Sequence, residues 1–192
     1  PGSCSVISPH TRVQCLTRPG TGANHSWEVT VSEQASGTFE TSSRYESPVI
    51  TSFDVNISTT VDVTDFQTPG EELIVINGIN FGPVVAVGAY DFPLEAVVTW
   101  SDGSNPYEFV YQDCSVIVPH RTITCITSAG CGSFLDWTLT VDGQQNVFPS
   151  TGYGVPFVHS IVGVNFSLAE GVPVDGGLFV DLVGENFGSI DE

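Results

Sequence analysis

The chain has 192 residues, 22 of them acidic and four basic, and its formal net charge is −18. A surface this acidic repels the phosphates of nucleic acids and of anionic membranes, so neither nucleic-acid partners nor direct membrane contact is expected for this segment. Because 41% of the residues are apolar and only 14% are charged, the composition predicts a folded chain and not an acidic tail.

Residues 1–43 begin with a segment that occurs twice in the sequence. Cys4–Thr17 reads CSVISPHTRVQCLT and Cys114–Thr127 reads CSVIVPHRTITCIT, with eight of fourteen positions identical. The two copies lie 110 residues apart, since 114 − 4 = 110. Self-similarity at a fixed spacing of this size indicates a repeat array.

The cysteines of this segment are predicted to clip a hairpin. Directly opposed residues of an antiparallel hairpin have a constant sum of positions, so pairing Cys4 with Cys15 and Cys114 with Cys125 centres both turns on one Pro-His dipeptide, Pro9-His10 and Pro119-His120. Opposed side chains lie near the reach of a disulfide. Zinc binding is the alternative, but the usual ligand pairs two to four residues apart are absent. Two local disulfides indicate an oxidising compartment.

The remainder of residues 1–43 contains one clear strand. Apolar residues alternate in Trp27–Val31, which is typical of a half-buried strand and places Trp27 in the core. The polar run 32–43 is predicted to be a linker or a long surface loop.

Residues 44–150 contain the parts of one whole unit. Pro48 suits the start of an edge strand, where no ladder N–H is required. The apolar run at 73–76 predicts another strand, and NGINFG at 77–82 predicts a turn after it. Trp137–Val141 alternates and precedes an Asp-Gly hairpin turn. With no helical periodicity, the unit is predicted to be an all-β sandwich of about seven strands.

Residues 151–192 start the pattern again. Tyr153 repeats the opening at Tyr45 with an offset of 153 − 45 = 108. GENFG at 184–188 repeats GINFG at 78–82 with an offset of 184 − 78 = 106. The sequence therefore predicts the C-terminal half of one repeat, a complete unit and the N-terminal half of the next, at 1–43, 44–150 and 151–192. Because it starts at Pro1 and lacks methionine, we expect a segment of a longer chain.

Three sequons predict N-linked glycans, at Asn24, Asn56 and Asn165. Asn56 and Asn165 are equivalent in the repeat, since 165 − 56 = 109, and both follow a valine. Polar loop residues without glycans are the alternative interpretation. Serines and threonines are abundant in 32–64, which leaves O-linked sugars open as well.

The remaining reactive side chains form no predicted catalytic or metal site. Cys131 is the odd cysteine, since Thr21 stands at its place in the first copy, and it is predicted to be unpaired or to bond another chain. His10 and His120 are expected to be exposed turn residues. No nucleophile and base recur together, so no enzyme activity and no cofactor are expected. Calcium held between adjacent units by separate loops stays an alternative.

These features together resemble the IPT/TIG family, the immunoglobulin-like domains shared by plexins and transcription factors. The Pro48 opening, the Gly-x-Asn-Phe-Gly turns, the cysteine pair and the final Trp-x-Leu-x-Val strand carry the resemblance. It implies tandem immunoglobulin-like (early-set) β-sandwich domains, in the disulfide-bearing form of extracellular arrays such as plexin and fibrocystin-like ectodomains. The DNA-binding branch uses basic loops, which four arginines and no lysine do not provide. The family brings no shared catalytic residues.

The function predicted from the sequence is structural. We expect a subunit of an extracellular or cell-surface glycoprotein fibre, filament or stalk that associates with copies of itself or with neighbouring repeats. The alternative is a receptor or adhesion ectodomain that binds a protein or glycan. A third interpretation is an accessory sandwich of a secreted polysaccharide-degrading enzyme. The half-repeats at the two ends either continue into further repeats or complete one another between chains by strand exchange.

Overall fold

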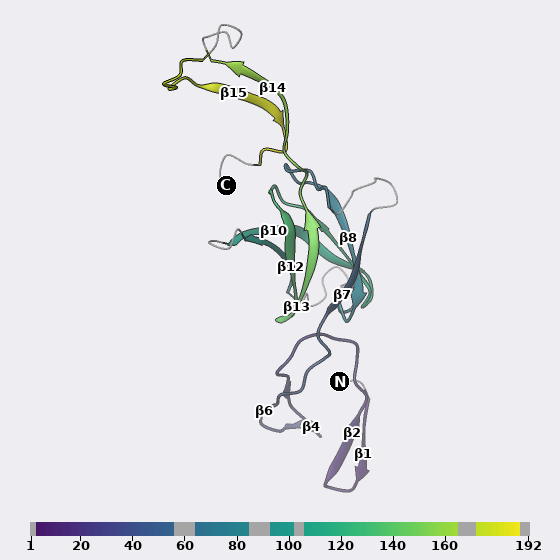
Figure 1. The fold of residues 1–192 in the computed structure, drawn as a ribbon. Coiled ribbons are helices and arrows are strands. Elements are labelled where there is room, and N and C mark those ends of the chain that lie inside the picture. Colours follow the sequence, from purple (N-terminus) through teal and green to yellow (C-terminus); the bar gives the residue numbers. More distant parts are fainter. Residues whose placement is uncertain (1–2, 56–63, 85–92, 102–105, 165–171, 189–192) are drawn as a thin grey trace.

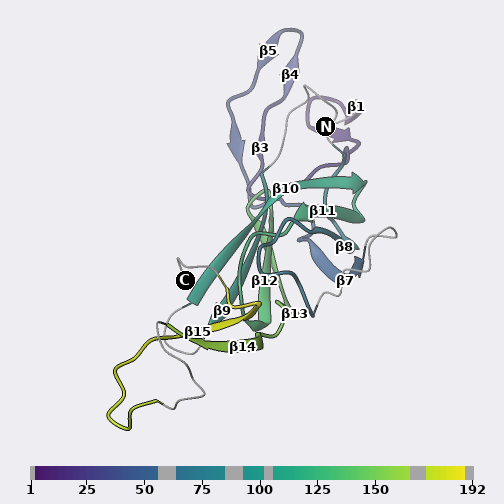
Figure 2. The same ribbon diagram turned by 90° about the horizontal axis from the view of Figure 1, so that it is seen from above.

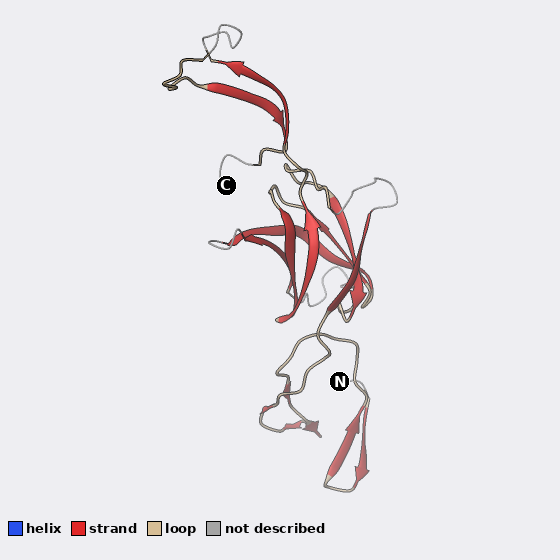
Figure 3. Cartoon of the chain, viewed as in Figure 1, coloured by secondary structure: helices blue, strands red, loops and turns tan. Residues whose placement is uncertain are grey.

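The computed structural model describes residues 3–55, 64–84, 93–101, 106–164 and 172–188, and every regular element among them is a β-strand (Figures 1 and 3). The predicted glycosylation sites Asn56 and Asn165 lie outside the described residues. The protein is therefore all-β, as the sequence predicts.

The centre of the molecule is a seven-stranded sheet that folds over on itself, here called the central sandwich. Its strands are β7 (Val49–Val55), β8 (Leu73–Ile79), β9 (Leu94–Ser101), β10 (Pro106–Val118), β11 (Thr122–Ile126), β12 (Ser133–Val141) and β13 (Gln144–Gly152), in the spatial order β13-β12-β9-β10-β11-β8-β7. The first half of β10 pairs with β9 and its second half pairs with β11. One long strand thus belongs to both layers, which gives the predicted sandwich-like architecture.

The change of layer within β10 has a local cause. The pairing register shifts between Gln112 and Ser115, and Asp113 between them has a left-handed φ of 51°. An unpaired residue at a bulge bends a strand and increases its twist. The strand can therefore leave one layer and enter the other without a break in the chain.

The core lies between the two layers. Trp137 of β12 is fully buried, and its ring centroid lies 4.8 Å from those of both Phe53 and Tyr111. Burying a large apolar side chain contributes roughly 1.5–3 kcal/mol, so the inward faces of β8, β11 and β12 supply much of the stability. Their fully buried members are Ile74, Ile76, Ile123, Cys125, Leu135, Leu139 and Val141.

The predicted turn at 77–82 begins later than expected. Strand β8 continues through Gly78 to Ile79, and the left-handed backbone appears only at Asn80 (φ 64°) and Gly82 (φ 89°). A Cβ on Gly78 would lie 2.1 Å from the carbonyl oxygen of Val49 on the adjacent strand. Gly78 is therefore required for close approach of two backbones and not for a turn.

The N-terminal segment (residues 1–43) consists of short hairpins: β1 (Cys4–Ser8), β2 (Arg12–Cys15), β3 (Ser26–Trp27), β4 (Thr30–Val31), β5 (Gln34–Ala35) and β6 (Phe39–Glu40). Strand β1 pairs with β2, β3 with β6 and β4 with β5. The prediction of a linker at 32–43 is wrong, because this stretch returns along β3 and β4. Its tight turn has left-handed φ values of 47° at Ser32 and 67° at Glu33, a conformation that these residue types rarely adopt.

The C-terminal segment (residues 151–192) contains the hairpin β14 (Phe157–Gly163) and β15 (Val180–Glu185). Figure 1 shows the N-terminal and C-terminal segments at opposite ends of the central sandwich, and Figure 2 separates them in the same way. Each end segment therefore meets the sandwich but not the other end segment.

Candidate functional site

Both predicted disulfides are present. Cys4 bonds Cys15 and Cys114 bonds Cys125, with Cα–Cα distances of 4.0 and 4.1 Å. Cys4 and Cys15 are also directly opposed in the β1–β2 ladder. The bonds thus clip hairpins across the strands, as the constant-sum argument predicts.

The two hairpin tips have the same conformation. The amide of Thr11 donates to Ser8 O at 3.2 Å, and the amide of Arg121 donates to Val118 O at 3.0 Å. A proline followed by a left-handed residue, φ 62° at His10 and 61° at His120, is the pattern of a type II turn. His10 is exposed, but His120 is half-buried because its amide donates to Gly82 O.

The sequence repeat is also a repeat of backbone conformation. Left-handed φ angles recur at an offset of 110 residues in the first part of the chain and 106 in the second. The first group is His10 and His120, Gly22 and Gly132, Asn24 and Phe134, and Ser32 and Asp142; the second is Asn80 and Asn186, and Gly82 and Gly188. Because bulky side chains disfavour this conformation, agreement at so many positions indicates that equivalent segments share one fold.

The β14–β15 hairpin repeats the pairing of β7 with β8. Ile161 opposes Leu182 as Phe53 opposes Ile76, and both ladders shift register at equivalent positions. A Cβ on Gly184 would lie 1.9 Å from Phe157 O, which repeats the close approach at Gly78. The end hairpin therefore has the geometry of the start of the central sandwich.

A buried tyrosine forms the junction between the central sandwich and the C-terminal segment. Tyr153 is 3% exposed, and its ring lies 6.0 Å from that of Phe66 and 5.5 Å from that of Phe109. Its hydroxyl donates to Ser128 O at 2.9 Å, and its amide donates to Gly132 O at 2.8 Å. The residue that opens the next segment is thus part of the preceding core.

The backbone around Tyr153 is fixed as well. The amide of Phe66 donates to Gly152 O at 2.9 Å, and the amide of Gly154 donates to Phe66 O at 2.7 Å. Only two residues, Val155 and Pro156, separate Gly154 from the start of β14. The connection is therefore short and hydrogen-bonded.

Tyr45 forms the equivalent junction between the N-terminal segment and the central sandwich. Its hydroxyl donates to Arg18 O at 2.6 Å and its amide donates to Gly22 O at 3.0 Å. These acceptors lie 110 residues before Ser128 and Gly132. The ring of Tyr45 contacts His25 at 5.2 Å but is only half-buried, because no aromatic pair like Phe66 and Phe109 covers it.

Asparagine fixes the chain on the far side of each tyrosine. Asn80 Nδ2 donates to Ser47 O at 3.0 Å, and Asn186 Nδ2 donates to Val155 O at 3.2 Å. The Gly-x-Asn-Phe-Gly motif thus supplies a close-packed glycine, an asparagine that holds the incoming chain, and a phenylalanine for the core. This use of the motif was not visible from the sequence, which indicated only a turn.

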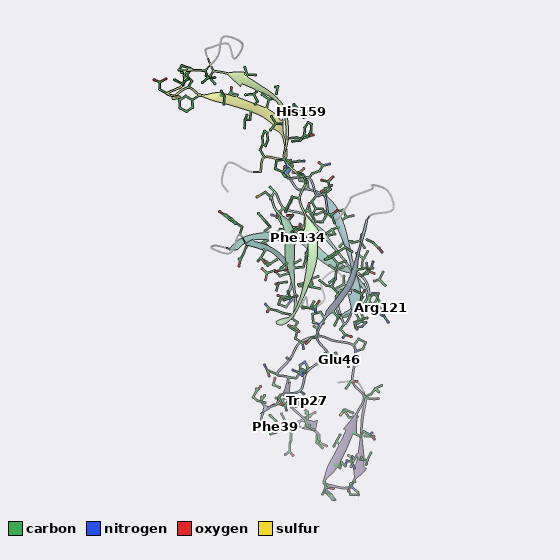
Figure 4. The ribbon with its side chains drawn as sticks, viewed as in Figure 1. Trp27, Phe39, Glu46, Arg121, Phe134 and His159 are labelled. Carbon is green, nitrogen blue, oxygen red and sulfur yellow. A yellow bond between two sulfur atoms is a disulfide. The ribbon has the colours of Figure 1, made fainter. Side chains whose placement is uncertain are left out.

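The first junction has further polar contacts, some of them around Glu46 between the two parts (Figure 4). Thr21 Oγ1 donates to Asp142 Oδ2 at 2.9 Å, and Gln144 Nε2 donates to Tyr45 O at 3.0 Å. Cys131 stands at the position of Thr21 and is half-buried. The odd cysteine therefore lies at the side of the sandwich that faces the next segment, and it is not disulfide-bonded in this structure.

Both end segments expose apolar faces that the central sandwich buries. Val13 is 43% exposed, whereas the equivalent Ile123 is fully buried. Leu182 is 53% exposed, whereas the equivalent Ile76 is fully buried. The hairpin β1–β2 and strands β3–β4 together line an apolar groove of about 360 Å³. Figure 4 shows Trp27 and Phe39 in this segment, away from the sandwich.

Trp27 does not occupy the predicted core position. It is 36% exposed, whereas its equivalent Trp137 is 0% exposed. The alternating pattern correctly gives its strand and face, but the residues that would cover that face are the equivalents of Phe53 and Tyr111. Neither is present in the N-terminal segment, because both belong to parts of the unit that this segment lacks.

The described residues hold no cluster of three or more histidine, cysteine, aspartate or glutamate side chains suited to a metal ion. In the same part of the chain no helix is long and apolar enough to cross a membrane. Burial raises the pKa of Tyr111 above its ordinary value, and the neighbouring Tyr153 adds to the rise. Tyr111 is therefore a neutral core residue and not a proton donor or acceptor for chemistry.

The glycosylation site that can be placed is Asn24. It is exposed and has a left-handed φ of 57°. Its equivalent, Phe134, is 89% exposed, so this position points to solvent in both copies. A glycan here would not displace the core.

Comparison with known proteins gives no match: no protein-family model, no curated protein and no solved structure matches the chain. The functional argument therefore depends on the junctions, the open faces and the disulfides.

Proposed function

We propose that the chain is a structural segment of an extracellular glycoprotein fibre, filament or stalk, built from tandem immunoglobulin-like units of the IPT/TIG type. In this proposal residues 1–43 and 151–192 are halves of neighbouring units, and residues 44–150 form the complete unit between them. The chain carries load and spacing, and it catalyses no reaction.

The observation that carries the proposal is the repeated junction. Tyr45 and Tyr153 donate their amide and hydroxyl protons to equivalent carbonyls, and Asn80 and Asn186 hold the chain that follows. A flexible linker between sandwiches would need neither a buried tyrosine nor these bonds. A junction that recurs with the same contacts gives each unit the same orientation relative to the last, which produces a regular rod.

The extracellular setting is supported by the disulfides. Cross-strand bonds such as Cys4–Cys15 persist in oxidising compartments and are rare in the cytosol. A hairpin of two strands is marginal alone, so a clip is useful where units are exposed to mechanical or proteolytic stress. The three sequons, Asn24, Asn56 and Asn165, fit a secreted glycoprotein.

Electron microscopy combined with small-angle X-ray scattering tests this proposal. We expect the purified chain to be elongated, and the native material to contain rods or filaments with a regular axial repeat. Treatment with a glycosidase is expected to lower the intact mass of the native protein. Compact particles with no rod or filament in the native material would overturn the structural function.

A further inference from the structure

We propose that copies of this chain join head to tail by sheet completion, with β15 of one copy pairing antiparallel with β2 of the next. This inference rests on the proposed fibre function for its biological meaning, but it concerns one specific contact. It names the two edges, their register and the side chains that select them.

The two strands have open edges. Among the described residues, β2 is hydrogen-bonded only to β1, and β15 only to β14. An unpaired edge presents a row of amide and carbonyl groups that can bind a further strand. The equivalent strands of the central sandwich, β11 and β8, use the corresponding edges to pair with each other.

The central sandwich gives the register of the proposed pairing. There Ile123 opposes Ile76 and Cys125 opposes Ile74. Subtracting 110 from the β11 positions and adding 106 to the β8 positions transfers this ladder to the ends of the chain. The resulting pairs are Arg12 with Val183, Val13 with Leu182, Gln14 with Asp181, and Cys15 with Val180.

The register brings exposed apolar residues together. Val13 and Leu182 are both about half exposed in the single chain, and their equivalents are fully buried. The joined strands β14-β15-β2-β1 reproduce the order β7-β8-β11-β10 of a complete layer. Ile161 would then enter the groove beside Trp27, at the place where Phe53 packs against Trp137.

The charges of the two ends are also complementary. Residues 1–44 hold three arginines and three glutamates, a net charge of 3 − 3 = 0, whereas residues 151–192 hold six acidic and no basic residues, a net charge of −6. In the proposed register Arg12 lies opposite Val183, diagonally between Asp181 and Glu185 on the same face. Opposite charges at such cross-strand positions favour pairing.

The positions of the two edges require the contact to be intermolecular. The N-terminal and C-terminal segments lie at opposite ends of the central sandwich (Figure 1), so β2 and β15 of one copy do not meet. A contact between two different surfaces does not close into a dimer and extends instead into a filament.

A cysteine-trapping experiment tests the register. Two variants of the full chain, Gln14→Cys and Asp181→Cys, are mixed under mild oxidation and analysed on a non-reducing gel and by mass spectrometry. We expect a mixed disulfide-linked dimer well above the background that each variant gives alone, a background that also accounts for links through Cys131. The matched control replaces Asp181→Cys by Asp175→Cys, an exposed acidic position of the same segment outside the strand.

A charge-reversal series tests the selectivity. Sedimentation velocity at rising protein concentration is expected to show association that Arg12→Glu weakens roughly five- to tenfold, and that Asp181→Arg in the partner copy restores. Arg18→Glu changes the net charge equally but lies outside β2, so it serves as the matched control and is expected to leave association unchanged.

Three results would overturn the inference in different ways. Equal cross-linking by the Asp175→Cys control refutes the register. Rods that form without the Gln14–Asp181 cross-link refute this contact and leave the fibre function in place. A chain that stays monomeric at every concentration refutes self-completion and shows that the flanking sequence of a longer chain covers these edges, whereas the fibre function is refuted only by the absence of rods in native material.

Discussion

The central sandwich and the N-terminal segment contain the same pattern of residues with different degrees of burial. Trp137 is fully buried and Trp27 is 36% exposed, although both lie on alternating strands followed by tight turns with left-handed backbone. The hairpin clip, the turn conformations and the tyrosine contacts are the same in both regions. The comparison shows that local sequence decides strand, face and turn, whereas burial depends on strands contributed from elsewhere.

The missing strands explain the difference. In the sandwich, β8 covers one edge of β11, and Phe53 and Tyr111 cover Trp137. The N-terminal segment lacks equivalents of all three. Its apolar face is therefore not a failure of the pattern, because it is one half of a core.

The largest expected effect comes from the tryptophans. Trp137→Ala should lower the free energy of unfolding of the central sandwich by about 3–5 kcal/mol, because it removes a fully buried ring. Trp27→Ala is the matched variant and should change that value by less than about 0.5 kcal/mol, as for other surface positions. Urea denaturation followed by circular dichroism measures both, and equal effects would contradict the comparison.

The junction tyrosines give the next largest effect. Tyr153→Ala should cost about 3–5 kcal/mol, since the ring fills the aromatic core between Phe66 and Phe109. Tyr153→Phe should cost only about 1 kcal/mol, the usual value of one hydrogen bond. Scattering should also show a broader range of interdomain orientations for Tyr153→Ala. An unchanged scattering profile would show that the tyrosine does not orient the C-terminal segment.

The two disulfides should differ in effect although their loops are equal in length. Replacing Cys114 and Cys125 by alanine should lower the stability of the central sandwich by about 2–3 kcal/mol, from the entropy of the opened loop. Replacing Cys4 and Cys15 should leave the unfolding midpoint of the sandwich unchanged. A similar shift for both pairs would mean that the N-terminal segment unfolds together with the sandwich.

The smallest expected effect concerns the close-packed glycine. Gly78→Ala should destabilise the sandwich by about 1–3 kcal/mol, because the added methyl overlaps Val49 O and the backbones must separate. Gly37→Ala is the control, since a Cβ there meets nothing within 4 Å. Thermal unfolding of the two variants distinguishes them, and a neutral Gly78→Ala would contradict the close approach.

Much of this fold could be predicted from the sequence because the signals were local or repeated. The pairing of Cys114 with Cys125, the Pro-His tips and the edge strand after Pro48 follow from spacing and residue chemistry. The all-β class follows from alternation. Each of these depends on a few neighbouring residues, for which sequence patterns are informative.

The features that could not be predicted depend on distant contacts or on unfavoured backbone conformations. Ser32 and Glu33 form a turn that their residue types do not indicate, so 32–43 was predicted as a linker. Gly78 was assigned to a turn because its role depends on Val49, which precedes it by 29 residues (78 − 49). The burial of Tyr153 in the preceding core has no signal in a single sequence, since it is defined only by Phe66 and Phe109.

The most direct test of the account completes the N-terminal segment with its own repeat. In a chain where a second copy of residues 44–110 precedes Pro1, hydrogen exchange of β2 to β4 should slow to the level of β11 and β12, because the supplied strands close the core. The sandwich should be unchanged. If β2 to β4 exchange as fast as in the original chain, the segments are not halves of one unit and the account is wrong.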